Sequence, residues 1–544
     1  MVSYLNGTNT DTVGWVGDPN GRGTLSLVIS SILTLGLCVW SAMHLNIPPR
    51  NESEAQVWIK NFKWGLVGVV APELVVFAAW RQYNSARALQ DILEKVSKDN
   101  QKYASKNEEF RYESRADIEP RHRWTMVHSF YAGMGGFVVE PDGPANEGGP
   151  VLTVSARGMA FLARCGHLPN ISKDDIKDKS KADGLAKSFV CIQAGWMVVQ
   201  VLGRVINNLP VTLLEVNTLG HVLCALIIYL LWWYKPRMVR EPTKLEGDWV
   251  APLCAYMYMS SKISGKKSRH AGLLRQTWYE PEISDLAFFT QPAPTNLQDS
   301  GNLTPYPDPE REGKINFSGG HFGIRPPVGD PTSGFVYSGT AELAQVPSGT
   351  QVKRWKLADI AVQDYPTIRE RFESTLCEPS KQSRNDPTWL RPTTEELLTA
   401  SASNWPEEEL LRGTEGLVMG MILWCASMAY GAVHIAAWND HFPTSAEKYL
   451  WRISAIYIAA SGLLWLLINL AAHTSKYIDE YWDTVLALRA HWTNYLVLGF
   501  LCSICGIAYA VARIFLVIEA FISIRKLPVA AYETPDWTQN IPHL

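Results

Sequence analysis

This chain of 544 residues contains seven apolar stretches that are separated by polar segments. Each stretch contains about 17 to 30 residues, and a membrane-spanning helix needs about 20. The stretches cover residues 24–43, 64–80, 189–206, 211–234, 417–438, 453–473 and 495–524. The pattern predicts an all-α, multi-pass integral membrane protein with about seven transmembrane helices and two large polar loop regions.

The alternation also predicts how the chain is organised. A polar N-terminal segment precedes two spans, and a helix that projects beyond Arg81 leads into the first polar region. A central hairpin separates this region from a second one rich in Pro, Gly and Ser, and three further spans precede a C-terminal strap. The expected boundaries are 1–23, 24–80, 81–187, 188–235, 236–413, 414–524 and 525–544.

The stretches 189–206 and 211–234 form the central pair, because an Asn-Asn-Leu-Pro turn joins them. Gln200 and Arg204 are four residues apart, so both lie on one helical face. Two tryptophans and a tyrosine precede Lys235 at the end of the pair, a pattern typical of a membrane interface. We therefore expect a transmembrane hairpin with a polar inner face.

The two polar regions carry weaker patterns. The apolar piece 126–139 is too short to span and contains three glycines, so we expect a loop packed on the helices, with a re-entrant segment as the alternative. Residues 265–350 are thick with Pro, Gly and Ser, which favours irregular structure. Short helices are expected around 356–372 and 394–411.

The orientation in the membrane stays open at the level of the sequence. Lysines and arginines flank the central hairpin, which favours a cytosolic location for both polar regions. Seven spans would then place the N-terminus inside and the C-terminus outside. The glycosylation sequon at Asn6 and the cations Arg525 and Lys526 oppose that arrangement.

Composition excludes several classes of protein. A net charge of -3 with no separate basic segment argues against nucleic-acid binding. Of the nine cysteines most lie in apolar runs, so we expect packing rather than disulfides, and Cys502 and Cys505 lack a second pair for a metal. No nucleotide-binding loop, serine elbow or zinc motif occurs, so we expect no cofactor and no metal.

Ionisable residues inside apolar runs are the candidates for chemistry, because their burial in a membrane is costly. Glu73 follows Pro72, which frees a backbone carbonyl beside the carboxylate. In a dry cavity Glu73 would suit a general acid. The alternative, which we favour, is an ion pair with a buried arginine that joins helices, and Arg513 with Glu73 or Glu215 is the first pair expected.

The second group of candidates opens the stretch 211–234. Glu215 and His221 would suit acid/base catalysis, and Asn217 lies four residues before His221 on the same face. Gln200, Arg204, Asn217, Arg513 and His434 would bind a lipophilic substrate. The alternative is that Glu215 caps its helix and His221 hydrogen-bonds across the bundle.

Several strings resemble a large, functionally uncharacterised family of fungal multi-pass integral membrane proteins. They are GWVGDPNGRGTLSL, HLNIPP, APELVVFAAWRQ, HSFYAGMGGFVV, IKDKSKADGLAK, LPVTLLEVNTLGHVLCALIIYLLWWYKP and PDWTQNIPHL. The resemblance implies a fungal origin and a membrane topology. It transfers no catalytic residue.

Two hypotheses follow. In the first, an intramembrane enzyme of cyclase or isomerase type acts on a lipophilic metabolite through Glu73 or Glu215, as enzymes of specialised metabolism do. In the second, the protein is a transporter, receptor or membrane scaffold with a structural polar core. The enzyme requires one of these carboxylates to line an enclosed pocket. If both face arginines with no void nearby, the hypothesis is to be abandoned.

Overall fold

The computed structural model describes most of the chain. The described residues are 12–18, 22–50, 52–106, 122–139, 151–180, 184–259, 261, 357–358, 360–361, 364–365, 368, 397–405, 415–475, 477–478 and 492–533. They are mostly helical, with a few short strands. The sequon at Asn6 and the stretch 265–350 lie outside the described residues.

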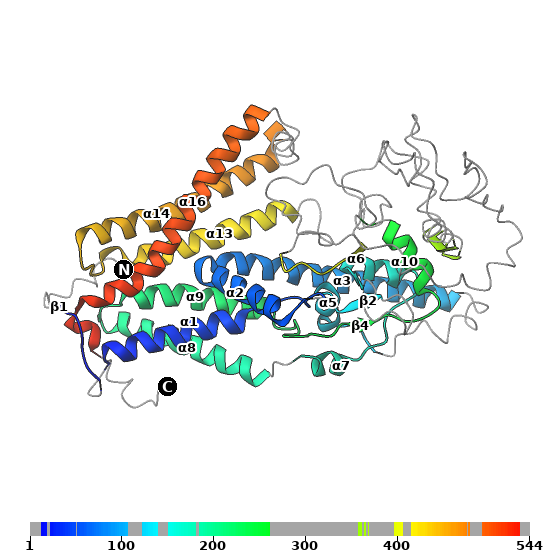
Figure 1. Cartoon of the computed structure of the whole chain (residues 1–544), viewed down its shortest axis with the longest axis horizontal. Coiled ribbons are helices and arrows are strands. Elements are labelled where there is room, and N and C mark those ends of the chain that lie inside the picture. Colours follow the sequence, from blue (N-terminus) through cyan, green and yellow to red (C-terminus); the bar gives the residue numbers. More distant parts are fainter. Residues whose placement is uncertain are drawn as a thin grey trace, which may run out of the picture.

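A bundle of long helices makes up one half of the molecule (Figure 1). Its members are α1 (Thr24–Ala42), α8 (Gly184–Ile206), α9 (Leu213–Leu231), α13 (Glu415–Ala436), α14 (Ser445–Thr474) and α16 (Trp492–Ile522). Five helices of the described chain are long and apolar enough to cross a membrane: Thr24–Ala42, Leu213–Leu231, Gly420–Asn439, Ser445–Ala471 and Phe500–Arg525. α8 contributes a shorter apolar helix, Val190–Ile206. The helices expected in these parts of the sequence are therefore confirmed.

Two local features explain details of the bundle. α14 begins two turns before the apolar run, because Thr444 and Glu447 form a capping box at its start. A Cβ on Gly431 of α13 would lie only 2.7 Å from the backbone nitrogen of Ala459 in α14. Glycine therefore allows these two helices to approach each other closely.

The expected single helix at 64–80 is wrong, because the chain breaks at Pro72. α2 (Glu54–Val70) ends there and α3 (Pro72–Lys106) begins, and the two helices are bent by 112°. Proline has no N–H to continue the hydrogen bonds of α2, and it fits the first position of a new helix. α3 then runs on without interruption beyond Arg81, as expected. It does not project into solvent, because Leu89 and Leu93 are buried in an apolar core.

The polar segments assemble into a second unit at one end of the bundle, which we call the polar domain (Figure 1). It contains α5 (Met126–Gly133), α6 (Ala156–Arg164), α7 (Lys173–Asp178) and α10 (Val250–Met259). A four-stranded sheet has the order β4 (Thr243–Lys244), β2 (Phe137–Val139), β3 (Leu152–Val154) and β5 (Leu398–Thr399). β2 pairs antiparallel with β3 and parallel with β4, and β3 pairs antiparallel with β5.

The polar domain has its own apolar core. Leu89 of α3, Phe137 of β2, Met159 of α6 and Leu253 of α10 are all fully buried in it. The stretch 126–139 is thus a helix and a strand of a folded unit rather than a loop.

Of the two short helices expected in the second polar region, the structure contradicts one and agrees with the other. The helix expected at 394–411 is wrong where the structure describes it, because residues 398–399 form β5. Helical residues at 357–358 and 360–361 agree with the short helix expected at 356–372.

The connection from α1 to α2 lies on the domain side of the bundle. The Ile47 N–H donates to the Met134 carbonyl at 3.0 Å. The Asn46 N–H donates to Asn404 Oδ1 at 2.6 Å. The far end of α3 contacts α5 and α6, so the α2–α3 pair both starts and finishes at the polar domain.

The two ends of the described chain meet at the opposite end of the bundle. β1 (Thr12–Val13), which precedes α1, pairs antiparallel with β6 (Leu527–Pro528), which follows α16 (Figure 1). Thr24 Oγ1 also lies 3.0 Å from Tyr532 Oη, just beyond β6. The described part of the segment after α16, up to Glu533, is therefore packed against the start of α1.

Candidate functional site

Glu73 and Arg513 form an ion pair in the middle of the bundle. Arg513 Nη2 of α16 lies 2.5 Å from Glu73 Oε2 at the start of α3, and both side chains are 1% exposed. The break at Pro72 places this carboxylate at a helix N-terminus, where the helix dipole favours a negative charge. The sequence prediction that Arg513 pairs with Glu73 is confirmed.

Tyr509 hydrogen-bonds to both members of this pair. Its hydroxyl donates to Glu73 Oε1 at 2.9 Å and accepts from Arg513 Nη2 at 2.8 Å. Ser427 Oγ of α13 lies 2.8 Å from the same hydroxyl. The guanidinium carbon of Arg513 lies 3.6 Å from the centre of the Tyr430 ring, which is a close cation–π contact. These contacts join α3, α13 and α16.

Asn217 and His434 extend the network toward α9 and α14. Asn217 Oδ1 lies 3.5 Å from the Tyr430 hydroxyl and 3.4 Å from His434 Nε2. His434 Nδ1 lies 2.9 Å from the Tyr430 carbonyl, one turn earlier in α13. Trp451 of α14 donates its indole N–H to the His434 carbonyl at 3.0 Å. Both predicted residues therefore hydrogen-bond between helices, as membrane-buried polar groups often do.

His221 contacts the break between α2 and α3. Its Nε2 lies 2.6 Å from the carbonyl oxygen of Val69, in the last turn of α2. Its Nδ1 lies 2.8 Å from the carbonyl oxygen of Asn217, one turn earlier in α9. His221 thus joins α9 to the break at Pro72, which we call the tip of the α2–α3 pair.

Glu215 forms a second buried cluster, near the paired chain ends. Arg22 Nη2 lies 2.5 Å from Glu215 Oε1, and Arg204 Nε lies 4.0 Å from the same oxygen. The other carboxylate oxygen accepts from the N–H and hydroxyl of Thr212, which completes a capping box at the start of α9. The expectation that Glu215 caps its helix is confirmed.

Arg204 holds the C-terminal segment to the hairpin turn. Its guanidinium donates to the carbonyl of Pro210 at 2.8 Å. It also donates to the carbonyls of Ala531 at 2.9 Å and Glu533 at 2.8 Å. Gln200, expected to act with Arg204, is half-buried and has no hydrogen bond to either carboxylate in the part of the chain that the structure describes.

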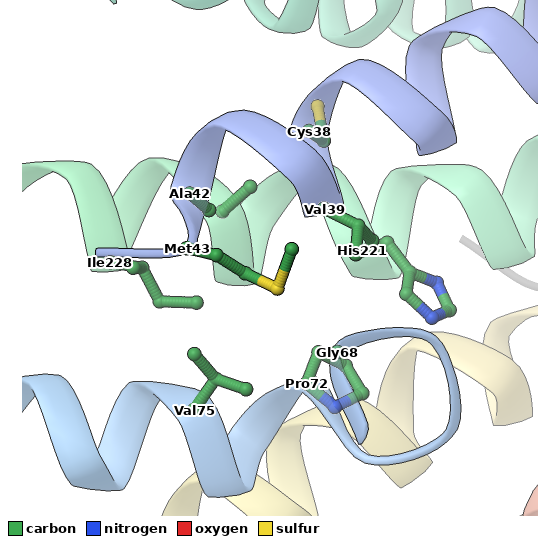
Figure 2. Close-up of a pocket in the computed structure, with 10 residues that line it drawn as sticks. Cys38, Val39, Ala42, Met43, Gly68, Pro72, Val75, His221 and Ile228 are labelled. Carbon is green, nitrogen blue, oxygen red and sulfur yellow. The ribbon is translucent and has the colours of Figure 1, made fainter. Parts of the chain in front are cut away.

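A small cavity lies beside the tip of the α2–α3 pair. Its volume is about 20 Å³, and its lining includes His221, Pro72 and Met43 (Figure 2). A cavity of this size holds about one water molecule and no lipophilic metabolite. Neither Glu73 nor Glu215 lines it.

Clusters of metal ligands and the cysteines are the remaining candidates for chemistry. No group of three or more His, Cys, Asp or Glu side chains able to hold a metal ion occurs among the described residues. Cys502 and Cys505 are both free thiols on α16, and Cys505 is exposed on the outside of the bundle.

Sequence reasoning missed several residues of these clusters, among them Tyr509, Ser427 and Arg22. Tyr509 precedes Arg513 by one helical turn, so the spacing could have identified it. Ser427 is a common residue in apolar helices and gives no signal. Arg22 lies in a polar segment outside the apolar runs, where the rule that singles out charges in apolar surroundings does not apply.

The fold and the site define a class: a helical protein with several apolar helices of membrane-spanning length and an ion-paired core. The chain belongs to a family of unknown function, DUF8562, whose model matches residues 2–298 and 417–544. The matched parts include the bundle and most of the polar domain. No curated protein and no solved structure matches the chain.

Proposed function

We propose that the protein is a non-catalytic integral membrane protein, a scaffold or receptor, whose buried ion pairs fasten its helices together. It crosses the membrane six times and inserts one re-entrant hairpin. The polar domain is displayed on one side, and the paired chain ends lie on the other. The resemblance to fungal multi-pass membrane proteins supports the location in a membrane.

The pairing of the chain ends supports this topology. β1 and β6 are hydrogen-bonded to each other, so an even number of crossings separates them. Six crossings result if the shorter apolar helix of α8 spans the membrane together with the five long helices, which are α1, α9, α13, α14 and α16. The α2–α3 pair then enters and leaves from the domain side, and its break at Pro72 is the buried tip. Helix breaks at this depth are tolerated where they are buried in protein, as this tip is.

The non-catalytic proposal rests on the ion pairs that the two carboxylates form. Glu73 is neutralised by Arg513, and Glu215 by Arg22 and Arg204. The cavity beside the tip has no room for a lipophilic substrate. These ion pairs and the small cavity support a structural role for both carboxylates over the acid/base role of the enzyme hypothesis. A broken helix at the core is also a feature of many transporters, so transport is the second candidate.

Replacement of the whole ion pair separates a structural from a catalytic role. The double variant Glu73→Gln/Arg513→Met removes both charges with similar volumes, and such replacements of buried pairs are often tolerated. We expect it to complement a gene deletion in the native host, with an unchanged profile of lipophilic metabolites in the deletion strain. A metabolite that accumulates on deletion, and that the folded double variant fails to convert, would contradict the proposal.

A further inference from the structure

The imidazole of His221 is held between two backbone carbonyl groups. Val69 of α2 presents its oxygen 2.6 Å from Nε2, and Asn217 of α9 presents its oxygen 2.8 Å from Nδ1. Both distances are those of good hydrogen bonds. In Figure 2 the ring points toward the loop at Gly68 and Pro72, which flank Val69 in the sequence.

The chemistry of the partners determines how many protons the ring needs. A carbonyl oxygen only accepts hydrogen bonds, and a neutral imidazole has one N–H and one lone pair. A neutral His221 would therefore direct a lone pair at one of the two oxygens. Only the imidazolium, which has an N–H on each nitrogen, can donate to both Val69 and Asn217.

His434 provides a comparison within the same network. Its Nδ1 also faces a carbonyl, that of Tyr430, at 2.9 Å. Its Nε2 faces the side-chain amide of Asn217, whose buried Nδ2 has no hydrogen-bond partner among the described residues. Rotation of that amide by 180° would offer an N–H to His434 Nε2. A neutral His434 is thus satisfied, whereas a neutral His221 is not.

Burial disfavours a charged imidazole at His221, so the two carbonyl hydrogen bonds and the surrounding charges must offset that cost. Glu73 of α3 and Arg513 of α16 both interact electrostatically with the ring, and they neutralise each other. α2 contributes its C-terminal carbonyls, and the negative end of a helix dipole stabilises a cation. Among the described residues, the other titratable groups near this region are Tyr430 and His434 of α13, Tyr509 of α16, Cys38 of α1 and Cys224 of α9.

We propose that His221 is a proton-binding site, and that the bound proton fastens the tip of the re-entrant α2–α3 hairpin to α9. If the neutral ring carries its proton on Nδ1, Nε2 has no N–H to donate to the carbonyl of Val69. A ring that keeps only Nε2–H must turn its lone pair away from Asn217, and the rotation moves Nε2 away from Val69. The adjacent cavity of about 20 Å³ can admit one water, which would then bond to the released carbonyl.

Two measurements on the full-length protein in lipid nanodiscs test the proton site. Nitrogen-15 NMR of histidine-labelled protein reports whether both ring nitrogens are protonated, and the His221→Gln spectrum assigns the signal. Hydrogen exchange of peptides covering residues 64–80, corrected for the intrinsic effect of pH, reports how firmly the tip is held. Both are followed from about pH 5 to pH 8, the range in which histidines titrate.

We expect His221 to be doubly protonated at the low end of this range. As it loses the proton, protection of the tip should fall about tenfold or more, as expected for the loss of a hydrogen bond to a charged group. In His221→Gln the protection should no longer depend on pH, whereas His434→Gln should keep the dependence. A neutral His221 throughout, or tip protection that is unchanged while His221 titrates, would overturn the proposal. Both of these results come from the wild-type protein, so they do not depend on the folding of a variant.

Discussion

The ion pair between Glu73 and Arg513 should be strongly coupled if it fastens α3 to α16. The perturbation is a double-mutant cycle that consists of Glu73→Gln, Arg513→Gln and the double variant. Each single change leaves a buried charge without its partner, and such changes cost about 3–5 kcal/mol. The double variant should lose clearly less stability than the sum of the two single variants.

The size of the coupling follows from the geometry. Two unit charges about 4 Å apart attract each other by about 4 kcal/mol at an effective dielectric constant of about 20. The nearest nitrogen and oxygen atoms of the pair are 2.5 Å apart. The centres of the guanidinium and carboxylate charges are therefore about 4 Å apart. Polar groups in the unfolded state within a membrane find other partners, which lowers the net value. We therefore expect a coupling of about 2–3 kcal/mol.

The assay is reversible unfolding in mixed micelles, with the free energy of unfolding measured for each variant. A matched control is the ion pair between Arg525 and Glu447, whose side chains are 45% and 18% exposed. The same cycle on this pair should give a coupling below about 1 kcal/mol. If Glu73 and Arg513 were additive within about 0.5 kcal/mol, the structural role assigned to the pair would be refuted.

Three further predictions concern other parts of the molecule. Arg204→Gln removes the guanidinium that binds the carbonyls of Pro210 and Ala531, so limited proteolysis should cleave the segment after β6 at lower protease concentrations than in the wild type; unchanged cleavage would contradict this role. Burial and, to a smaller extent, the charge of Glu215 raise the pKa of Asp440 from 3.8 to about 7. The folded state therefore holds this proton more tightly than the unfolded state, so this contribution to stability falls as pH rises from about 4 to 7. Asp440→Asn should consequently raise the unfolding temperature at pH 8 and change it little at pH 4, and an equal effect at both values would argue against the prediction. Gly431→Leu should separate α13 from α14 and destabilise the bundle by about 1–3 kcal/mol. The same change at Gly36, where the added Cβ meets no atom of another described element within 4 Å, should be nearly neutral.

The sequence predicted most of the bundle because long apolar runs identify helices well. The break at Pro72 was missed because the run 64–80 has the length of a span and a tryptophan at each end. Proline at the start of the new helix and glutamate next to it were both visible. Their effect depends on the surrounding helices, which provide Arg513 and Tyr509 as partners for Glu73.

The polar domain could not be predicted from the periodicity of apolar residues in the sequence. Its strands contain only two or three residues each, and β3 pairs with β5 although about 250 residues separate them. Strands this short carry no alternating pattern. The ion pair between Arg22 and Glu215 could not be predicted from the sequence either. Arg22 lies in a polar segment, and its distance from Glu215 along the chain does not indicate a contact.

Determination of the membrane topology tests the account most directly. Protease cleavage sites can be inserted after Asp18, Glu52, Asp174 and Val529, and each can be probed from either side of sealed vesicles. Asp18 and Val529 flank the paired strands, Glu52 precedes the re-entrant hairpin, and Asp174 lies in α7 of the polar domain. Six crossings and one re-entrant hairpin predict that Asp18 and Val529 are cleaved from one side, and Glu52 and Asp174 from the other. Cleavage of Asp18 and Val529 from opposite sides, or of Glu52 and Asp174 from opposite sides, would contradict the account.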